Sequence, residues 1–417
     1  MSGRLKESMS MRLRQIALLS VALMVPAAWS QTVPPTEGPA MHGQPAWHLQ
    51  GSFPDPTGFT LVDPDGHVSV VPREQRGPRA PSADSGPSCS HSPICGRRGG
   101  KARGAMQRVE WAQQLGYTFS YPYFVPRGFG GVPSVALDSK GNLWVFKRSP
   151  PGSPQLFKFD SSHKLVLTVG EDVIGRQDKA HGMAVDANDH VWITDNGQAT
   201  VMELSSDGKV LRTIGTRGHR GDWVEARGQR LLWQPVMIAF APNGDLYIAE
   251  GHANESPNDV DSDDPTNIEG VARVIHLDKD GKFVNQWFGN EVGNGKFDST
   301  HGFAIDPTNG DVWIGDREQY RIVIYNANGE FLRTLQMRNL VCALNFDHHG
   351  NPWMASGQDG QFLKLDRDGR VLGAIGNGMG IDTGQFTEAS YWAFDRSDNL
   401  YAGDTSVGRV TVMTRPK

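Results

Sequence analysis

The phrase HGMAVDANDHVWITD (residues 181–195) returns in nearly the same form as HGFAIDPTNGDVWIGD (residues 301–316). Each copy reads as an apolar strand, a polar turn that begins at an Asp, and a second apolar strand that completes a hairpin. Four further copies follow the same pattern, one of them with Ala in place of the Asp. These anchor residues recur at intervals of about 40 to 65 residues, which indicates a repeat architecture. They are Asp138, Asp186, Ala241, Asp306, Asp347 and Asp395.

Each unit continues into a second hairpin with Asp-Gly or Asn-Gly at its turn, as in TVMELSSDGKVLRTIG (residues 200–215). Four antiparallel strands per unit, repeated radially, form the blades of a β-propeller. The sequence therefore predicts an all-β, six-bladed β-propeller. The last copy ends after three strands, so we expect VEWAQQLGYTF (residues 109–119) to supply the fourth strand and close the ring. A β-sandwich is the alternative fold, but it would not explain six similar phrases.

The composition is that of a globular protein with many turns. Of 417 residues, 38% are apolar and 21% are charged, which is ample for a large core. The net charge of −5, with no stripe of Lys and Arg, argues against a nucleic-acid partner. We expect a monomer that acts on a small or peptide ligand.

The N-terminus has the pattern of a secretory signal peptide. Two arginines precede an apolar run over residues 16–25, and Ala28 and Ser30 have the small-residue spacing of a cleavage site. The run is shorter than the ~20 residues that span a bilayer, although an uncleaved anchor is the alternative. We expect residues 1–30 to be removed after Ser30, leaving a secreted or periplasmic protein without a membrane span.

The sequence predicts a low-complexity segment before the propeller. Residues 31–105 are rich in Pro, Gly, Ser and Arg, which favours a linker or disorder, with one isolated hairpin over residues 57–71. The propeller then occupies residues 106–417. Within it, NDVDSDD (residues 258–264) has the acid density of a calcium loop but lacks the Gly and Glu that an EF-hand needs. We interpret it as a solvated flap, with calcium binding as the alternative.

One ring of positions should lie at one end of the central channel, five residues before each anchor. Two imidazoles from different blades then point at one axis, and neutral imidazole is a ligand that suits zinc. A hydrogen-bonded structural role is the alternative for each histidine. The ring consists of Pro133, His181, Val236, His301, Cys342 and Ser390.

The ends of the second strands, about ten residues past each anchor, should reach the same end of the channel. Two arginines, several carboxylates and a histidine fall there. Arginine suits a carboxylate-bearing ligand because its guanidinium forms paired hydrogen bonds with a carboxylate. A local ion pair of Arg317 with Asp316 or Glu318 is the alternative. The positions are Arg148, Asp195, Glu250, His252 and Arg317.

The blades, among them GVPSVALDSKGNLWVFKRS, HGMAVDANDHVWITD and YWAFDRSDNLYAGDT, resemble those of NHL-type six-bladed propellers. Specifically, residues 109–417 resemble the peptidyl-α-hydroxyglycine α-amidating lyase family. That family cleaves a C-terminal α-hydroxyglycine into a peptide amide and glyoxylate, with zinc held by three histidines. The resemblance implies that His181 and His301 hold zinc and that Arg148 and Arg317 meet the carboxylate of the substrate.

The chain departs from the family pattern at three positions. Ser390 stands where the third histidine is expected, Tyr391 replaces an aspartate tied to a structural calcium, and His252 replaces the catalytic tyrosine. A histidine serves as a general base near neutral pH, so we expect His252 to take that role. Cys342 is a candidate soft ligand in place of the missing imidazole, with a buried structural thiol as the alternative.

The predicted function is a secreted, metal-dependent carbon–nitrogen lyase for a small carboxylate-bearing or peptide substrate. Its alternative is a non-catalytic propeller that has lost the metal and binds a peptide or protein partner on its channel face. A calcium-dependent lactonase-type propeller is a third reading, but the ring positions supply no Asp, Asn or Glu for it. The candidate residues are Arg148, His252 and Arg317 for catalysis and His181, His301 and Cys342 for zinc.

Overall fold

The computed structural model describes most of the chain from residue 112 onward, together with the backbone of three short strands before it. The described ranges are 48–50, 58–62, 68–72, 112–123, 130–177, 179–252, 272–289, 295–297, 299–337, 340–405 and 407–417. The predicted signal peptide, the stretch 258–264 and most of residues 31–105 lie outside them. Among the described residues, no helix has the length and apolar character needed to cross a membrane.

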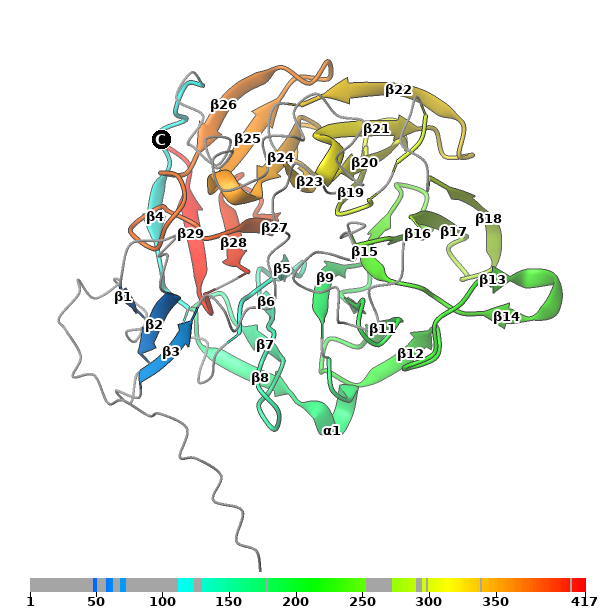
Figure 1. Ribbon diagram of the computed structural model, residues 1–417, viewed down its shortest axis with the longest axis horizontal. Helices are drawn as coiled ribbons and strands as arrows, with labels where there is room; N and C mark the ends of the chain where they lie inside the picture. Colours follow the sequence, from blue (N-terminus) through cyan, green and yellow to red (C-terminus); the bar gives the residue numbers. More distant parts are fainter. Residues whose placement is uncertain are drawn as a thin grey trace, which may run out of the picture. The chain divides into compact units, whose positions relative to one another are not determined.

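Six four-stranded antiparallel sheets surround a central axis, one for each repeat (Figure 1). The predicted six-bladed β-propeller is confirmed. Blades 1 and 2 consist of β5 (Ser134–Leu137), β6 (Leu143–Phe146), β7 (Leu156–Phe159), β8 (Leu165–Val169), β9 (Ala180–Val185), β10 (Val191–Asp195), β11 (Thr200–Leu204) and β12 (Val210–Ile214). Blades 3 and 4 consist of β15 (Pro235–Phe240), β16 (Leu246–Glu250), β17 (Arg273–Leu277), β18 (Phe283–Phe288), β19 (Gly302–Ile305), β20 (Val312–Asp316), β21 (Arg321–Tyr325) and β22 (Phe331–Gln336).

The ring closes within the sixth blade by pairing a strand from each end of the propeller. Blade 5 consists of β23 (Val341–Phe346), β24 (Pro352–Ser356), β25 (Gln361–Leu365) and β26 (Val371–Ile375). Blade 6 consists of β27 (Ala389–Phe394), β28 (Leu400–Asp404), β29 (Val410–Thr414) and β4 (Thr118–Ser120). Strand β4 lies antiparallel to β29, with Ser120 opposite Val412. The predicted closure by the segment before blade 1 is therefore present, and β4 overlaps the end of the predicted stretch.

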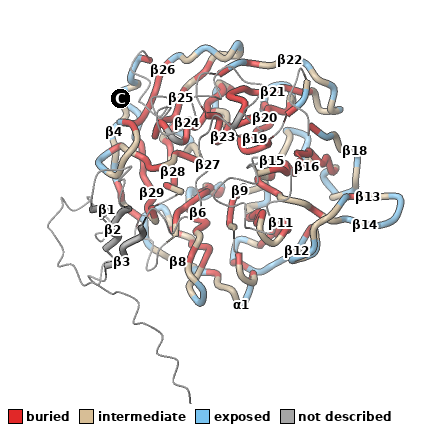
Figure 2. The backbone as a smooth tube through the Cα atoms, in the orientation of Figure 1, coloured by how far each residue is buried: buried red, intermediate tan, exposed pale blue. Residues whose placement is uncertain are grey.

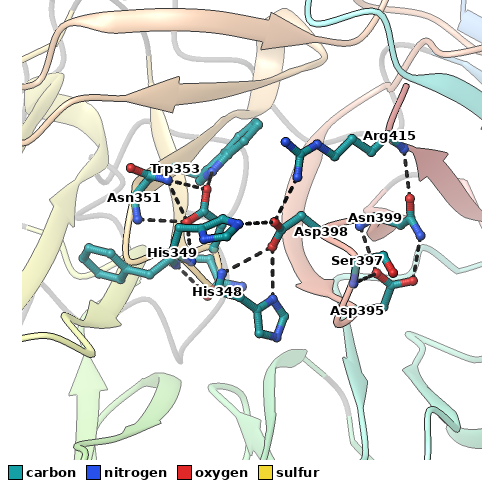
Figure 3. A network of polar contacts seen from close by, with 12 residues as sticks. His348, His349, Asn351, Trp353, Asp395, Ser397, Asp398, Asn399 and Arg415 are labelled. Carbon is teal, nitrogen blue, oxygen red and sulfur yellow. Dashed lines mark hydrogen bonds and ion pairs between the residues drawn. The ribbon is translucent and has the colours of Figure 1, made fainter. Parts of the chain in front are cut away.

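The anchor Asp shapes the turn of the first hairpin in each blade that has one. In Asp138, Asp186, Asp347 and Asp395, one carboxylate oxygen accepts the backbone N–H groups two and four residues later. Figure 3 shows these turns in blades 5 and 6, where the side chain of Asn399 also donates to Asp395 at 2.8 Å. The carboxylate satisfies N–H groups that would otherwise lack a partner, which explains why Asp recurs there.

The core lies between the blades. The inner strands are almost wholly buried, whereas outer strands such as β8 and β12 consist mostly of exposed and half-buried residues (Figure 2). A tryptophan six or seven residues after the anchor is fully buried in four blades: Trp144, Trp192, Trp313 and Trp353. These large side chains fill the wedge between adjacent sheets, where burial of apolar area contributes most to stability.

Few elements lie outside the blades. The predicted hairpin over residues 57–71 is present as β2 (Gly58–Val62) and β3 (Val68–Pro72), and β1 (His48–Gln50) pairs with β2. The other elements among the described residues are the short helix α1 (Glu171–Ile174), the hairpin β13 (Trp223–Val224) and β14 (Gln229–Arg230), and the 3₁₀ turns η6 (Glu225–Arg227), η7 (Arg317–Gln319) and η8 (Gly357–Asp359).

Candidate functional site

Three histidines from blades 2, 3 and 4 converge at one end of the channel. The ligand nitrogens of His181, His252 and His301 all lie within 4.8 Å of one another, and each pair of rings has its centroids 5.0 Å apart. The structure thus brings together His181 and His301, which the repeat register predicted to share the axis. It adds His252, which the sequence placed at the same end of the channel but in a different role. We call these three residues the histidine cluster.

Two rings of the histidine cluster are oriented by the next blade. The Nδ1 atom of His181 donates to the carbonyl oxygen of Val236 at 2.8 Å, and Nδ1 of His301 donates to that of Cys342 at 2.6 Å. A carbonyl only accepts, so Nδ1 carries the proton and Nε2 keeps its lone pair. Val236 and Cys342 occupy the same repeat position as the histidines, so one pattern of bonds is used twice.

The glycine after His181 permits this close approach. A Cβ atom at residue 182 would lie 2.4 Å from the carbonyl oxygen of Val236, which accepts the bond from His181. The hydroxyl of Thr194 also donates to that oxygen, at 3.0 Å, and accepts from the backbone N–H of Gly182 at 2.8 Å. The HG pair and the Thr near the end of the second strand therefore serve one purpose, which is to hold the imidazole against its acceptor.

His252 reaches the cluster from the end of the second strand of blade 3. Gly251, which precedes it, has φ +107, and a Cβ atom there would lie 2.6 Å from the Cα of Ala272. Only glycine tolerates this conformation at such a close contact. The backbone of Gly251 is tied on both sides, because its N–H donates to Gln234 and its carbonyl accepts from Thr300, both at 3.0 Å. The turn thus projects His252 toward the axis.

The three imidazoles are held in the neutral form. Burial, which disfavours the charged imidazolium, lowers the pKa of each ring well below its ordinary value. Repulsion adds to this effect: from His301 and Arg148 on His181, from the other two imidazoles on His252, and from Arg317 on His301. Neutral rings offer nitrogen lone pairs, which is the state that metal coordination requires.

Both predicted arginines lie beside the histidine cluster. Arg148 follows β6, and its Nε donates to the carbonyl oxygen of Ala180 at 3.0 Å, one residue before His181. Arg317 begins the 3₁₀ turn after β20, is 6% exposed, and has Nη1 3.8 Å from Oε1 of Glu388. Asp316, the local partner that the alternative would use, pairs with Nε of Arg321 at 2.8 Å. Two cationic groups therefore flank three neutral imidazoles.

The thiol of Cys342 is not part of the histidine cluster. Among the described residues, the group of close ligand atoms at this end contains the three histidines alone. Cys342 is fully buried, and its sulfur packs on the backbone of Gly357, where a Cβ atom would lie 2.2 Å from it. Its contribution to the cluster is the main-chain carbonyl that orients His301. The geometry matches the alternative of a structural thiol.

Asp195 and Glu250, the two carboxylates predicted to lie at this end of the channel, bind main-chain N–H groups. One oxygen of Asp195 accepts the backbone N–H groups of Gly197 and Gln198 at 2.7 and 2.9 Å. Glu250 forms a wholly buried ion pair with Arg273 and accepts from the N–H of Trp233 at 2.6 Å. Both acids therefore help to hold the ends of the second strands.

The opposite half of the channel contains a cavity. This cavity of about 390 Å³ is lined by the inner strands of all six blades, and Tyr391 forms part of its wall. A second group of possible ligands, Asp186, His190 and Glu203, lies at the anchor turn of blade 2. Its members already pair with one another and with Arg212, whose Nε donates to Glu203 at 2.9 Å. The sequence singled out neither feature.

Sequence comparison supports the family resemblance. No protein-family model matches the chain. The chain is 26% identical over 242 residues to a peptidyl-glycine alpha-amidating monooxygenase of Mus musculus, which covers 51% of this chain and 22% of that protein. It is 22% identical over 211 residues to a probable peptidyl-alpha-hydroxyglycine alpha-amidating lyase of Caenorhabditis elegans, covering 50% and 51%. The matched segment thus spans at most about half the length of these relatives.

Solved structures share the fold. A gluconolactonase of Xanthomonas campestris superposes with a TM-score of 0.51 at 16% identity, covering 75% of this chain and 94% of that one. A putative gluconolactonase gives a TM-score of 0.50 at 15% identity, covering 74% and 96%. At this level of identity the likeness concerns the propeller architecture alone.

Proposed function

We propose that this six-bladed propeller, which is similar in sequence to amidating lyases, is a metal-dependent carbon–nitrogen lyase. Its substrate would carry an α-hydroxyglycine end, and its products would be glyoxylate and an amide. The observation that carries the proposal is the convergence of three neutral imidazoles beside two guanidinium groups at one end of the channel. The predicted signal peptide makes export from the cell part of the same proposal.

The donor set of the histidine cluster fits a borderline divalent ion. Three imidazole nitrogens suit zinc, whereas calcium prefers oxygen ligands. Two of the rings direct Nε2 away from their carbonyl partners, and such outer hydrogen bonds are the usual support of metal-binding histidines. We assign His181, His252 and His301 as the residues that would hold the ion, with His252 in the place predicted for Cys342.

A zinc ion bound there would supply Lewis acidity toward an oxygen of the substrate. The protein would supply the rest. Arg148 and Arg317 would bind the carboxylate of the α-hydroxyglycine end and fix its orientation by charge-assisted hydrogen bonds. Burial of the cluster excludes water and strengthens these interactions.

The proton transfer stays with His252 as the sequence predicted. The described residues give its ring no hydrogen-bond partner, unlike those of His181 and His301. A neutral imidazole has one nitrogen lone pair, so His252 can accept the proton of the substrate hydroxyl only when that lone pair is not bound to the ion. His252 would therefore be the general base while His181 and His301 hold the ion, and the third ligand when no substrate is bound.

Elemental analysis of the purified protein, paired with an assay for glyoxylate release from an α-hydroxyglycine compound, tests the proposal. We expect about one zinc per chain and glyoxylate release in the wild type. His301→Ala should lose the metal and the activity, with affinity lowered by more than about 100-fold. His276→Ala is the matched control, because His276 is also buried but contacts Asp245 and Tyr247 in an outer strand of blade 3.

The opposite result would favour the non-catalytic alternative. A wild-type protein without metal, together with unchanged folding in His181→Ala and His301→Ala, would indicate a propeller that binds a peptide or protein partner on its channel face. Metal binding without glyoxylate release would support the metal site at the histidine cluster but reject the α-hydroxyglycine substrate.

A further inference from the structure

We propose that Tyr391 is a positioning residue of the histidine cluster, an inference that rests on the proposed function. Tyr391 lies on β27 in blade 6 and is 2% exposed. Its hydroxyl donates to the carbonyl oxygen of His301, and its ring lies edge-on to the ring of His181 with centroids 5.6 Å apart. One side chain thus contacts two members of the cluster, each from a different blade.

The bond from Tyr391 to His301 joins blades that are not neighbours. His181 and His301 donate to the blade that follows their own, whereas the Tyr391 hydroxyl passes the inner strand of blade 5 to reach blade 4. It therefore fixes the spacing of blades 4 and 6 across the axis, which contacts between adjacent blades do not fix directly.

A break in strand pairing aims Tyr391 into the channel. The register of β27 against β28 shifts between Ala389 and Trp392, so Ser390 and Tyr391 lie in the irregular segment. Such bulges change the direction of a side chain and are frequent beside functional sites. The first strands of blades 2, 3 and 5 shift register in a similar way, so Tyr391 makes its cross-channel bond from an irregularity that the repeat itself contains.

The bond completes the restraints on His301. Its backbone N–H donates to the hydroxyl of Ser299 at 3.3 Å, its ring donates to Cys342, and its carbonyl accepts from Tyr391. The Ser299 and Cys342 contacts leave the carbonyl side of the residue unrestrained. Tyr391 restrains that side and, through its ring, limits the motion of His181, so that two of the three nitrogens keep their separation.

Tyr391→Phe is the test, because it removes the hydroxyl and keeps the ring, which contacts His181 and lines the cavity. Tyr325→Phe is the matched control: Tyr325 is 4% exposed, and its hydroxyl also donates to a main-chain carbonyl, that of Gly295, in an outer strand of blade 4. Cobalt(II), a spectroscopic substitute for zinc, is titrated into both variants and the wild type, and thermal unfolding is followed in parallel.

We expect both variants to unfold at a lower temperature, but only Tyr391→Phe to bind cobalt about tenfold more weakly and to change its visible spectrum. A cobalt affinity and spectrum equal to those of the wild type, with a lower unfolding temperature, would make Tyr391 merely structural and overturn the proposal.

A metal-free measurement separates this inference from the proposed function. If the wild type binds no cobalt, the proposed function fails, and ¹⁵N-histidine NMR of the metal-free protein decides the role of Tyr391. A shift of the Nδ1–H resonance of His301 in Tyr391→Phe, absent in Tyr325→Phe, would support positioning. An unshifted resonance would reject it.

Discussion

The two ends of the channel use the repeat in opposite ways. At the end with the anchor turns, five of six blades keep the same Asp, and four of these make the same pair of backbone hydrogen bonds. At the other end, the position five residues earlier differs in every blade except for the two histidines. The residue that recurs in most blades stabilises their sheets. Residues that differ from blade to blade at one repeat position can instead meet on the axis and form a site.

Histidines at the two ends show that environment, not residue type, marks the site. His348 and His349 at the anchor end are exposed and contact the carboxylate of Asp398 at 3.1 and 3.3 Å (Figure 3). His181 and His301 at the other end are buried, donate to carbonyls and face one another. Burial lowers the pKa of His181 and His301, which keeps these rings neutral and available to a metal.

Removal of an anchor Asp should have the largest effect on the free energy of unfolding and no effect on the metal content. Asp347→Ala leaves Nε1 of Trp353 and the ammonium of Lys364 without the carboxylate that now lies 3.1 and 3.3 Å away. We expect the free energy of unfolding to fall by about 3 kcal/mol. Urea unfolding measures the loss, and elemental analysis should show unchanged metal content.

Asp395→Ala is the companion to that variant. Asp395 makes the same turn bonds but faces the hydroxyl of Tyr401 rather than a lysine, so the loss should be smaller. Equal losses in the two variants, or a drop in metal content in either, would contradict the separation between the ends.

The pH dependence of the free energy of unfolding distinguishes two lysines, one at each end of the channel. Burial lowers the pKa of Lys147, next to Arg148, to about 8 from 10.5. Between these values the unfolded chain holds a proton that the folded chain has released, so the stability of the wild type rises with pH. We expect Lys147→Met to be about 2 kcal/mol more stable than the wild type at pH 7. The gap should close by about pH 10, as measured by urea unfolding across that range.

Lys158→Met, at the anchor end, is the control for that measurement. Lys158 pairs with Asp138 at 3.3 Å and lies over the ring of Trp144, so its loss should destabilise the protein at neutral pH. A Lys147→Met gap that stays constant with pH would reject the buried-charge explanation.

The smallest effect is expected where a blade has lost its anchor. Blade 3 has Ala241 in the anchor position, and the aromatic side chain that follows is Tyr247, whose hydroxyl donates to Ala327 at a long 3.4 Å. Tyr247→Phe should change the free energy of unfolding by less than about 0.5 kcal/mol. Thermal unfolding checks this, and a loss near that of Asp347→Ala would show that Tyr247 replaces the missing carboxylate.

Repetition made the fold and two of the three members of the histidine cluster predictable. The interval between anchors indicated six blades, and the shared register of His181 and His301 placed both at one end of the axis. His252 was predicted to lie there as well, but its partnership with them depends on a turn that Gly251 makes after β16, which no repeat copies. The AEGH phrase was the available signal.

Other features were hidden because they depend on main-chain atoms. The link between Cys342 and the cluster is a carbonyl oxygen, which residue identity does not reveal. Tyr391 enters the channel through an irregularity in strand pairing, and regular alternation gives no sign of it. Sequence reasoning located the side chains of the site better than the backbone that orients them.

The pairing of β4 with β29 also has a consequence for biosynthesis. Residue 118 is synthesised long before residue 412, so β4 has no strand to pair with until nearly the whole propeller has been translated. Blades 1 to 5 carry all four of their own strands and are able to assemble in order as they emerge. Pairing of β4 with β29 is therefore the last step of folding, and a chaperone that shields β4 until then should raise the yield of closed propellers.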